Sequence, residues 1–548
     1  MTKIALVLGG GVSLGSYIAG TVTEILRALA SGGPAGPVRL QVITGTSAGA
    51  LNAALAARAL TVNPGVAPWL EKAWVDGADA AWLLNPGRRA RAGVLDPTVL
   101  EDLTRALIAG GPASDDAPSS AVGDPLRVGV TLASLHGVRY DFRYGFLNDP
   151  ERAFGTRRYA DAMDFEIRPG AAADPAWERL REAALASAAF PFAFPPRRIL
   201  RRQDEYPGGR LPGGAGRETE MWYVDGGLFD ATPLGLAKDL VERDAAHRGA
   251  DWRYVLVEPT LRASGDGRST RAGAPESVAA LAADLTRAVL GQSAAQDWIR
   301  ANRMNARLEI LHALLERLPE MDDRLTDPDD VVLGRYVGDL AERVAEMHVA
   351  AAPTGGGERG ADPVVDVLDR DIERIEADPR YADVLASAGS RPGRSRLAKL
   401  IYVLESASGL RDKDVLPLYL VAPSSDDELA GDYLGGFGGF LHREWRAHDF
   451  RAGRSDARRL LSGGLAEVFP SYRPGPDPEY EVEPVEPTWA SVPGDAKRRL
   501  EGALAAEAER LVAEVRPGPV GAAFAWAWKP VVRRWLAQRA LQAIASAS

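Results

Sequence analysis

Two short apolar runs near the N-terminus, each followed by a glycine-rich turn and a helix-forming segment, constrain the fold of this chain most strongly. Ile4–Leu8 leads into GGGVSLG, and Arg39–Ile43 leads into TGTSAG and then ALNAALAARAL. Nearly continuous apolar runs are typical of strands that are buried on both faces of a parallel sheet. The repeated order of strand, glycine turn and helix therefore predicts an α/β fold with helices on the faces of the sheet.

Later segments extend this organisation along the 548 residues. Helix-like segments dominate from about residue 275, and residues 472–489 are rich in proline and acid. We predict a core in 1–265, a mainly helical insertion in 266–410, a segment completing the core in 411–470, and a proline-rich linker with C-terminal helices in 471–548. Four further apolar runs are predicted strands of the parallel sheet: Leu126–Leu132, Trp222–Val224, Tyr254–Val257 and Leu416–Val421.

Charge and cysteine content exclude several classes of function. The formal net charge is -10, which argues against a nucleic-acid-binding protein because such proteins need a basic surface. The chain has no cysteine, so disulfides, thiolate metal sites and cysteine nucleophiles are excluded. We find no signal-peptide pattern and no apolar run of about 18 residues, so we expect a cytoplasmic protein.

The first glycine cluster, GGGVSLG, follows a predicted strand and could bind a phosphate. The P-loop pattern fails because Ser16 stands where the lysine belongs, and the Rossmann pattern fails because Leu14 replaces the third glycine. The backbone N–H groups of such a loop can still converge on a negative oxygen of a phosphate or a tetrahedral intermediate. A tight strand-to-helix connection without a ligand is the alternative interpretation.

The second cluster places Ser47 within Gly45-Thr46-Ser47-Ala48-Gly49, between a predicted strand and a predicted helix. This context is the one that a nucleophile elbow requires. A serine at a helix N-terminus also lies near the positive end of the helix dipole. The alternative is that Ser47 only caps the following helix.

A serine nucleophile needs a base, and none of the six histidines follows an apolar strand in a glycine turn. Asp225, in MWYVDGGLFDATPL, is the better candidate because it ends a short predicted strand and is followed by two glycines. Open α/β sheets place their active sites at the carboxyl ends of strands. A turn-capping role is the alternative for Asp225.

Four motifs in this order resemble the patatin-like phospholipase family: GGGVSLG, GTSAG, ALASAAFPFAFPP (184–196) and DGGLFDATPL (225–234). The resemblance implies a three-layer α/β/α sandwich and a Ser–Asp dyad without histidine. Ser47 would then be the nucleophile and Asp225 the base, and the backbone amides of Gly10, Gly11 and Val12 would form the oxyanion hole. No metal or other cofactor is implied.

The implied activity is that of a serine acyl hydrolase that cleaves carboxylic esters of lipids, of the phospholipase A or lysophospholipase type, through an acyl-enzyme. A catalytically silent lipid-binding or partner-binding protein on the same fold is the alternative. The first loop lacks the basic residue found in many members of the family, which puts recognition of an anionic head group in doubt. Asp230-Ala231-Thr232 also replaces the usual Asn-Asn pair.

Two C-terminal features complete the predictions. Residues 429–461 resemble a segment found late in large bacterial patatin-related proteins. The polar residues Arg446, His448, Asp449 and Arg454 within it could form a network near the site, but structural ion pairs are the favoured interpretation. Residues 522–544 combine four aromatic residues with Lys529 and three arginines, which suits transient contact with a membrane surface. Packing of this alanine-rich tail on the protein body is the alternative.

Overall fold

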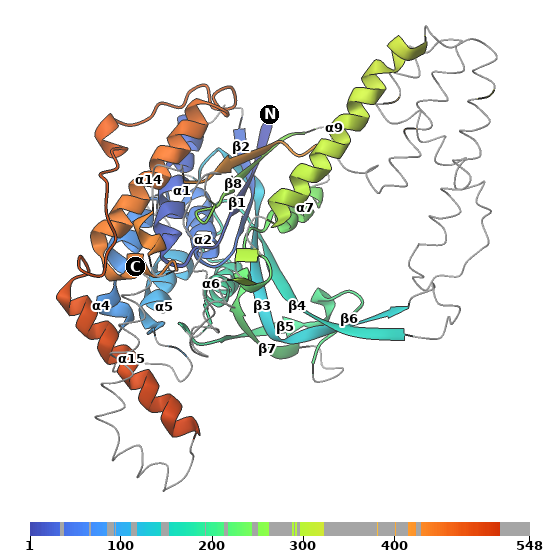
Figure 1. The fold of residues 1–548 in the computed structure, drawn as a ribbon. Coiled ribbons are helices and arrows are strands. Elements are labelled where there is room, and N and C mark those ends of the chain that lie inside the picture. Colours follow the sequence, from blue (N-terminus) through green and yellow to red (C-terminus); the bar gives the residue numbers. More distant parts are fainter. Residues whose placement is uncertain are drawn as a thin grey trace.

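The computed structural model of the chain is shown in Figure 1. It describes residues 1–32, 38–64, 67–84, 93, 95–110, 118–143, 153–191, 193–212, 218–243, 250–261, 288–289, 291–292, 296–322, 332, 381, 401, 415–423, 429–433 and 435–515. Most of the predicted insertion at 266–410 and the whole of 522–544 lie outside the described residues. Within the described residues, no helix is long and apolar enough to cross a membrane.

The described strands form one sheet of nine, in the order β5-β7-β3-β2-β1-β8-β9, with β4 and β6 also paired to β3. All six predicted strands are present. The strands are β1 (Thr2–Leu8), β2 (Val38–Gly45), β3 (Val122–Arg143), β4 (Ala153–Ile167), β5 (Arg197–Arg202), β6 (Gly209–Arg210), β7 (Glu218–Asp225), β8 (Asp251–Val257) and β9 (Leu418–Val421).

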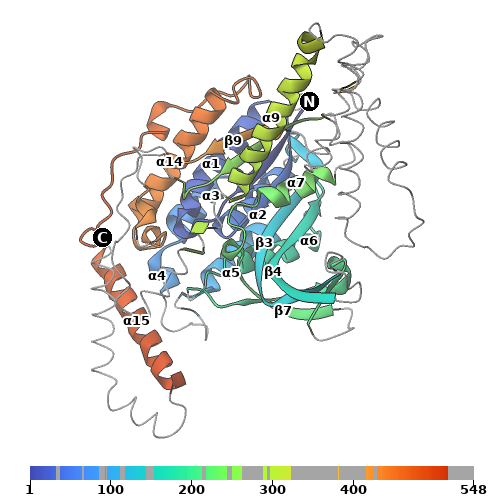
Figure 2. The ribbon, with the colours of Figure 1, turned by 45° about the vertical axis from the view of Figure 1, so that its right-hand side comes forward.

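The sheet is mixed, which corrects one prediction. Strands β3, β2, β1, β8 and β9 are parallel neighbours, but β4, β6 and β7 run antiparallel to β3, and β5 runs antiparallel to β7. The assignment of Trp222–Val224 to a parallel sheet is therefore wrong. Strand β3 has 22 residues and continues past its parallel pairing with β2, so antiparallel partners cover the remainder. Figure 2 shows this extension below the parallel strands.

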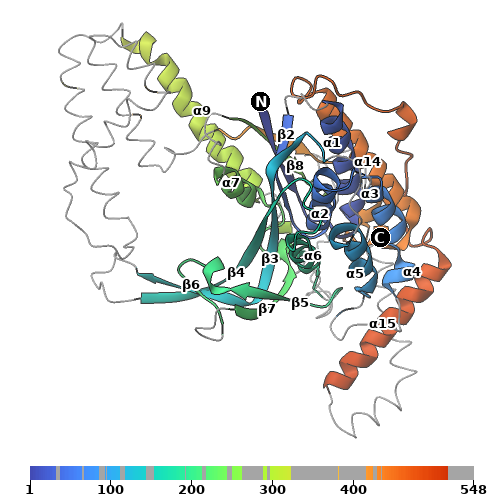
Figure 3. The same ribbon diagram turned by 180° about the vertical axis from the view of Figure 1, so that it is seen from behind.

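Helices cover both faces of the parallel strands, so the predicted three-layer α/β/α sandwich is confirmed (Figures 1 and 3). One layer contains α1 (Gly15–Ser31), α2 (Ala48–Thr61) and α14 (Arg443–Ser462), and the other contains α7 (Leu234–Glu242) and α9 (Gln296–Asp322). Side chains of a strand alternate between its two faces. In β1, Ile4, Leu6 and Leu8 accordingly join the first hydrophobic cluster, whereas Ala5 and Val7 join the second.

Further helices, most of them shorter, lie between and after these elements. They include two π-helices, η3 (Lys72–Gly77) and η4 (Arg105–Ala109), in the connection between β2 and β3. The remaining described helices are η1 (Val12–Leu14), α3 (Trp69–Glu71), η3 (Lys72–Gly77), α4 (Ala80–Leu83), α5 (Thr98–Thr104), η4 (Arg105–Ala109), α6 (Ala176–Ser187), η5 (Gln203–Glu205), η6 (Gly226–Leu228), η7 (Ala430–Asp432), η8 (Gly438–Leu441), η9 (Asp477–Glu479) and α15 (Gly494–Val515).

Helix α14 packs directly against α1 although more than 400 residues separate them. A Cβ atom on Gly20 would lie 2.0 Å from the Phe450 carbonyl oxygen, and one on Gly453 would lie 2.0 Å from the Tyr17 carbonyl oxygen. Only glycine at both positions permits backbones to approach this closely. The Thr21 hydroxyl donates to the Gly453 carbonyl oxygen at 3.1 Å.

A buried polar network completes this helix–helix contact. The Arg454 guanidinium donates to the carboxylate of fully buried Glu24 at 3.1 Å, and the hydroxyls of Tyr472 and Tyr480 donate to the same carboxylate at 2.7 and 2.9 Å. Burial and the neighbouring Glu24 raise the pKa of Tyr472, so its hydroxyl stays protonated and can donate. This network fixes α14 and the chain that follows it onto α1.

Candidate active site

Ser47 lies at the sharp turn between β2 and α2, with φ 55° and ψ −122°. In the described part of the chain, Ser47 and Val12 are the two non-glycine residues with positive φ. The turn is tight, since a Cβ atom on Gly45 would lie 2.4 Å from the Gly49 carbonyl oxygen, and one on Gly49 would lie 2.3 Å from the Leu8 carbonyl oxygen. Backbone strain of this kind is concentrated at functional sites.

The Ser47 side chain does not cap α2, although the residue occupies the N-cap position. Its hydroxyl instead donates a 2.5 Å hydrogen bond to Oδ2 of Asp225. Its backbone N–H donates to Oγ of Ser187 at 2.8 Å, which fixes the turn from the end of α6. The geometry therefore disfavours the capping interpretation of this serine.

Asp225 reaches Ser47 because β7 approaches from beyond the end of the parallel sheet. Gly45 of β2 pairs with Val130 of β3, and Asp225 pairs with Leu132, two residues further along β3. Antiparallel β7 thus ends at the same edge where β2 turns into α2. Gly226 permits this approach, since a Cβ atom there would lie 2.4 Å from the Thr131 carbonyl oxygen.

The Asp225 carboxylate is buried and is hydrogen-bonded at both oxygens. Oδ1 accepts the Gly227 N–H at 2.8 Å, so Asp225 does cap its turn while Oδ2 accepts the Ser47 hydroxyl. Burial raises the pKa of Asp225 to about 7, against the smaller lowering by the hydrogen bonds from Ser47 and Gly227. Half of the carboxyl groups are therefore ionised near neutral pH, which suits a general base.

The histidines that the structure describes lie elsewhere. His442 Nδ1 accepts the Glu444 N–H at the start of α14, and His448 Nδ1 pairs with the Glu483 carbonyl oxygen. His136 lies in β3 and His312 in α9, and neither hydrogen-bonds to Ser47 or Asp225 within the described residues. In the same part of the chain, no group of three or more His, Asp and Glu residues is arranged to hold a metal ion.

The glycine loop between β1 and α1 passes beside Ser47, and a Cβ atom on Gly10 would lie 3.6 Å from the Ser47 Cβ. The Gly10 N–H donates to the Ala231 carbonyl oxygen at 2.9 Å, so the fold itself occupies this predicted oxyanion donor. The amides of Gly11 and Val12 have no acceptor among the described residues. Val12 has φ 53°, a rare conformation for a β-branched residue. The candidate donors are thus reduced to Gly11 and Val12.

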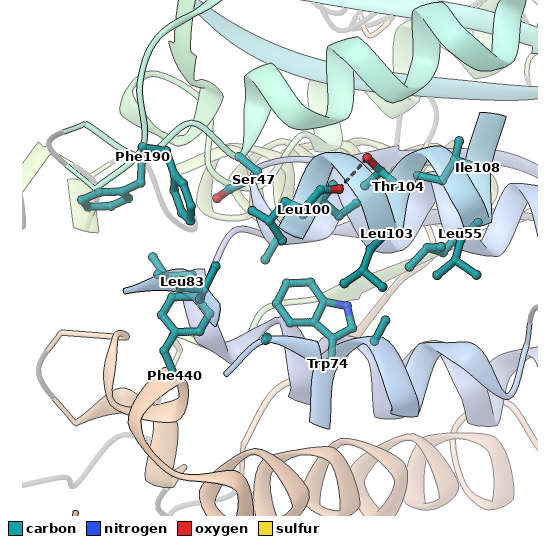
Figure 4. Close-up of a pocket in the computed structure, with 18 residues that line it drawn as sticks. Ser47, Leu55, Trp74, Leu83, Leu100, Leu103, Thr104, Ile108, Phe190 and Phe440 are labelled. Atoms are coloured by element: carbon teal, nitrogen blue, oxygen red, sulfur yellow. Dashed lines mark hydrogen bonds between the residues drawn. The ribbon is translucent and has the colours of Figure 1, made fainter. Parts of the chain in front are cut away.

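An apolar pocket opens beside Ser47 (Figure 4). The space inside the pocket, including its open mouth, is about 740 Å³. Ser47 lies at one end in this view, and Leu55 and Ile108 lie at the other. The lining residues are Val12, Ser47, Ala48, Leu51, Leu55, Ala73, Trp74, Ala78, Leu83, Leu100, Leu103, Thr104, Leu107, Ile108, Ala188, Phe190, Phe194 and Phe440.

The few polar groups around this pocket are bonded within the protein. The Thr104 hydroxyl donates to the Leu100 carbonyl oxygen at 2.6 Å, and the Trp74 indole N–H donates to Oδ1 of Asn52 at 2.9 Å. The Ser47 hydroxyl is therefore presented to an otherwise apolar cavity. Such a cavity suits a hydrocarbon chain attached to a group that reacts at Ser47.

The sequence indicated only some of the residues that surround Ser47, Asp225 and the pocket. The motif at 184–196 supplies Ser187, which accepts the Ser47 N–H, and Phe190 and Phe194, which line the pocket. Its Ala189 carbonyl oxygen also accepts the Asp225 N–H at 3.0 Å. By contrast, no sequence pattern indicated the wall formed by the π-helices η3 and η4.

Two family models and one curated protein match parts of this chain. A family model described as patatin-like phospholipase matches residues 6–238, and one described as a protein of unknown function (DUF3376) matches residues 417–465. The chain is 27% identical to Uncharacterized protein y4iI of Sinorhizobium fredii, over 47% of this chain and 49% of that protein. This chain thus spans about half the length of the curated relative that it matches. Residues 6–238 of this chain are therefore similar to the patatin-like phospholipase family.

Proposed function

We propose that this chain is a serine acyl hydrolase that cleaves carboxylic esters of lipids, of the phospholipase A or lysophospholipase type. The similarity of residues 6–238 to patatin-like phospholipases supports action on lipid esters. The observation that carries the proposal is the 2.5 Å hydrogen bond from the Ser47 hydroxyl to buried Asp225, beside an apolar pocket. A nucleophile hydrogen-bonded to its base is the arrangement that covalent catalysis requires.

In the first step, Ser47 Oγ attacks the ester carbonyl carbon while Asp225 accepts the hydroxyl proton. The bond from this carbon to the alcohol oxygen then breaks, and Asp225 returns the proton to the leaving alcohol. Water attacks the resulting acyl-serine with Asp225 again as base, which releases the fatty acid and restores Ser47. The raised pKa of Asp225, about 7, makes its carboxylate a stronger base than an ordinary aspartate.

The negative oxygen of the tetrahedral intermediate would be stabilised by the amides of Gly11 and Val12. These two N–H groups lie in the loop beside Ser47 and make no hydrogen bond within the described residues. One such donor typically contributes about 3 kcal/mol to stabilising the transition state. The N-terminus of α2, which begins at Ala48, adds the positive end of a helix dipole.

The acyl chain of the substrate would occupy the apolar pocket. Ser47 and Leu55 lie on the pocket side of α2 and are eight residues apart, which corresponds to about 12 Å at 1.5 Å per residue. Each methylene group moved from water into such a pocket contributes about 0.8 kcal/mol of binding free energy. We therefore expect longer acyl esters to be preferred over acetyl esters until the chain reaches Leu55 and Ile108.

Ester hydrolysis by purified variants tests this proposal. The Ser47→Ala and Asp225→Asn variants should lose at least about 10³-fold in kcat, as dyad members do in other hydrolases. Ser491→Ala and Asp204→Asn carry the same chemical changes at exposed positions and should keep wild-type activity. Wild-type protein that binds acyl chains but hydrolyses no ester would instead support the catalytically silent alternative.

A further inference from the structure

The loop 429–441 lies against the glycine loop, although more than 400 residues separate the two in sequence. The Ser13 hydroxyl donates to the Gly436 carbonyl oxygen at 2.6 Å and accepts the Gly439 N–H at 3.1 Å. The Ser13 N–H also donates to the Gly436 carbonyl oxygen, at 2.9 Å. Ser13 is fully buried, so its polar groups bond to these protein atoms and not to water.

Helix α14 holds this loop by two side chains on neighbouring turns. The Asp449 carboxylate accepts the N–H groups of Ala430 and Gly431 at 2.8 and 2.9 Å. The Arg446 guanidinium donates to the Gly439 carbonyl oxygen at 2.7 Å. Both side chains are buried, so their charges depend on these hydrogen bonds.

Arg446 also connects the loop to a second element of the pocket wall. It donates to the Val75 carbonyl oxygen at 2.8 Å and to Oδ2 of Asp79 at 2.7 Å. Val75 follows Trp74 in π-helix η3, and Trp74 lines the pocket together with Phe440 from the loop. One buried guanidinium therefore bridges two elements that line the candidate acyl site.

The two candidate oxyanion donors lie between residues that the fold fixes on both sides. The Gly10 N–H is bonded to Ala231, and Ser13 is bonded to the loop 429–441, whereas the amides of Gly11 and Val12 between them stay available among the described residues. Val12 is held at φ 53°, which a β-branched residue adopts only when its surroundings impose it. Ser13 is the residue after Val12, so its hydrogen bonds to Gly436 and Gly439 fix the backbone directly after the two donors.

We propose that residues 429–449, within the region matched by the model of unknown function, form a clamp that holds the Gly11 and Val12 amides in the oxyanion-binding geometry. Ser13, Arg446 and Asp449 are its positioning residues. This inference rests on the proposed function, because the clamp acts on the hydrolysis at Ser47. It assigns a catalytic role to a segment outside the matched patatin-like residues 6–238.

The test compares Ser13→Ala and Asp449→Asn with Tyr472→Phe. Ser13→Ala removes the hydroxyl bonds to the clamp, and we expect kcat to fall by about 10–100-fold because small displacements of catalytic groups have effects of this size. KM for the acyl ester and the pH profile of kcat should not change, since the pocket and Asp225 are intact. Tyr472→Phe also removes a buried hydroxyl bond between the C-terminal segment and α1, and it should keep wild-type kcat.

Two further results separate failure of the clamp from failure of the proposed function. If Ser47→Ala hydrolyses esters as well as wild type does, the proposed function fails and the clamp fails with it. If Ser47→Ala is inactive but folded Ser13→Ala and Asp449→Asn keep wild-type kcat, or change only KM, the clamp alone is overturned. Thermal unfolding of each variant identifies any that do not fold, and Asp449→Asn carries the test if Ser13→Ala is among them.

Discussion

Changing the pH between 5 and 9 should switch the proposed base between its two protonation states. Burial raises the pKa of Asp225 to about 7, against an ordinary value of 3.8. With that pKa, about 1% of the carboxyl groups are ionised at pH 5 and about 99% at pH 9. Because only the carboxylate can accept the Ser47 proton, kcat/KM should rise about tenfold per pH unit below 7 and reach a plateau above it.

The assay is the initial rate of hydrolysis of a soluble acyl ester across this pH range, at substrate concentrations well below KM. Single-turnover acylation should show the same inflection, because Asp225 acts in that step. A profile that is flat from pH 5 to pH 9 would contradict the reasoning. It would mean that Asp225 titrates near its ordinary pKa, or that another group accepts the proton.

The same pKa has a consequence for stability. Because the pKa of Asp225 is higher in the folded than in the unfolded protein, its stabilising contribution is fully present below pH 4 and is lost as the pH rises through 7. The difference of about 3 pH units corresponds to a free energy of about 4 kcal/mol. Asp225→Asn should remove this part of the pH dependence, as measured by urea unfolding of both proteins at pH 4.5 and pH 8. Equal pH dependence in the two proteins would contradict the raised pKa.

Two further predictions concern packing. Gly453→Ala should lower the free energy of unfolding by about 3 kcal/mol, because the new Cβ would lie 2.0 Å from the Tyr17 carbonyl oxygen and separate α1 from α14. The control Gly502→Ala lies in open space within α15 and should raise the free energy of unfolding by about 0.5 kcal/mol. Urea unfolding measures both changes. Leu55→Trp should shorten the acyl pocket, so hydrolysis of long-chain esters should fall about tenfold while that of acetyl esters is unchanged; an equal loss on both would contradict the assigned acyl site.

Local sequence patterns predicted the serine turn and six of the nine described strands, but not β4, β5 and β6. The apolar runs predicted all six strands named from the sequence. Burial on both sheet faces explains the runs in β1 and β2, whereas in β7 Trp222 is exposed. The glycines around Ser47 predicted a sharp turn, and the structure shows that larger residues at 45 and 49 would meet backbone oxygens. The α/β class followed from the same patterns, and the three-layer α/β/α sandwich followed from the resemblance.

Non-local contacts account for what the sequence did not predict. The direction of β7 depends on its pairing with the far half of β3, about 90 residues away, and nothing in Trp222–Val224 encodes it. The sequence predicted the Gly10 amide as an oxyanion donor, but in the fold this amide donates to the Ala231 carbonyl oxygen. Ser13 and Gly436 are 423 residues apart, so no local pattern could relate the C-terminal loop to the glycine loop.

The positions of the polar residues of α14 relative to the site also depend on non-local contacts. Arg454 forms the structural ion pair with Glu24 that its residue type suggested. Arg446 also forms an ion pair, with Asp79, and in addition Arg446 and Asp449 bind the loop beside the candidate oxyanion donors. Which of these charged residues lie near the site depends on the face of α14 that each occupies after it packs on α1.

The central claim is that Ser47 is the nucleophile and Asp225 its base. Its most direct test is reaction of the wild-type protein with a fluorophosphonate, followed by proteolysis and mass spectrometry to find the modified residue. The account predicts one adduct on Ser47, no labelling of Ser47→Ala, and at least 100-fold slower labelling of Asp225→Asn. Labelling of another residue, or equal labelling rates for wild type and Asp225→Asn, would contradict it.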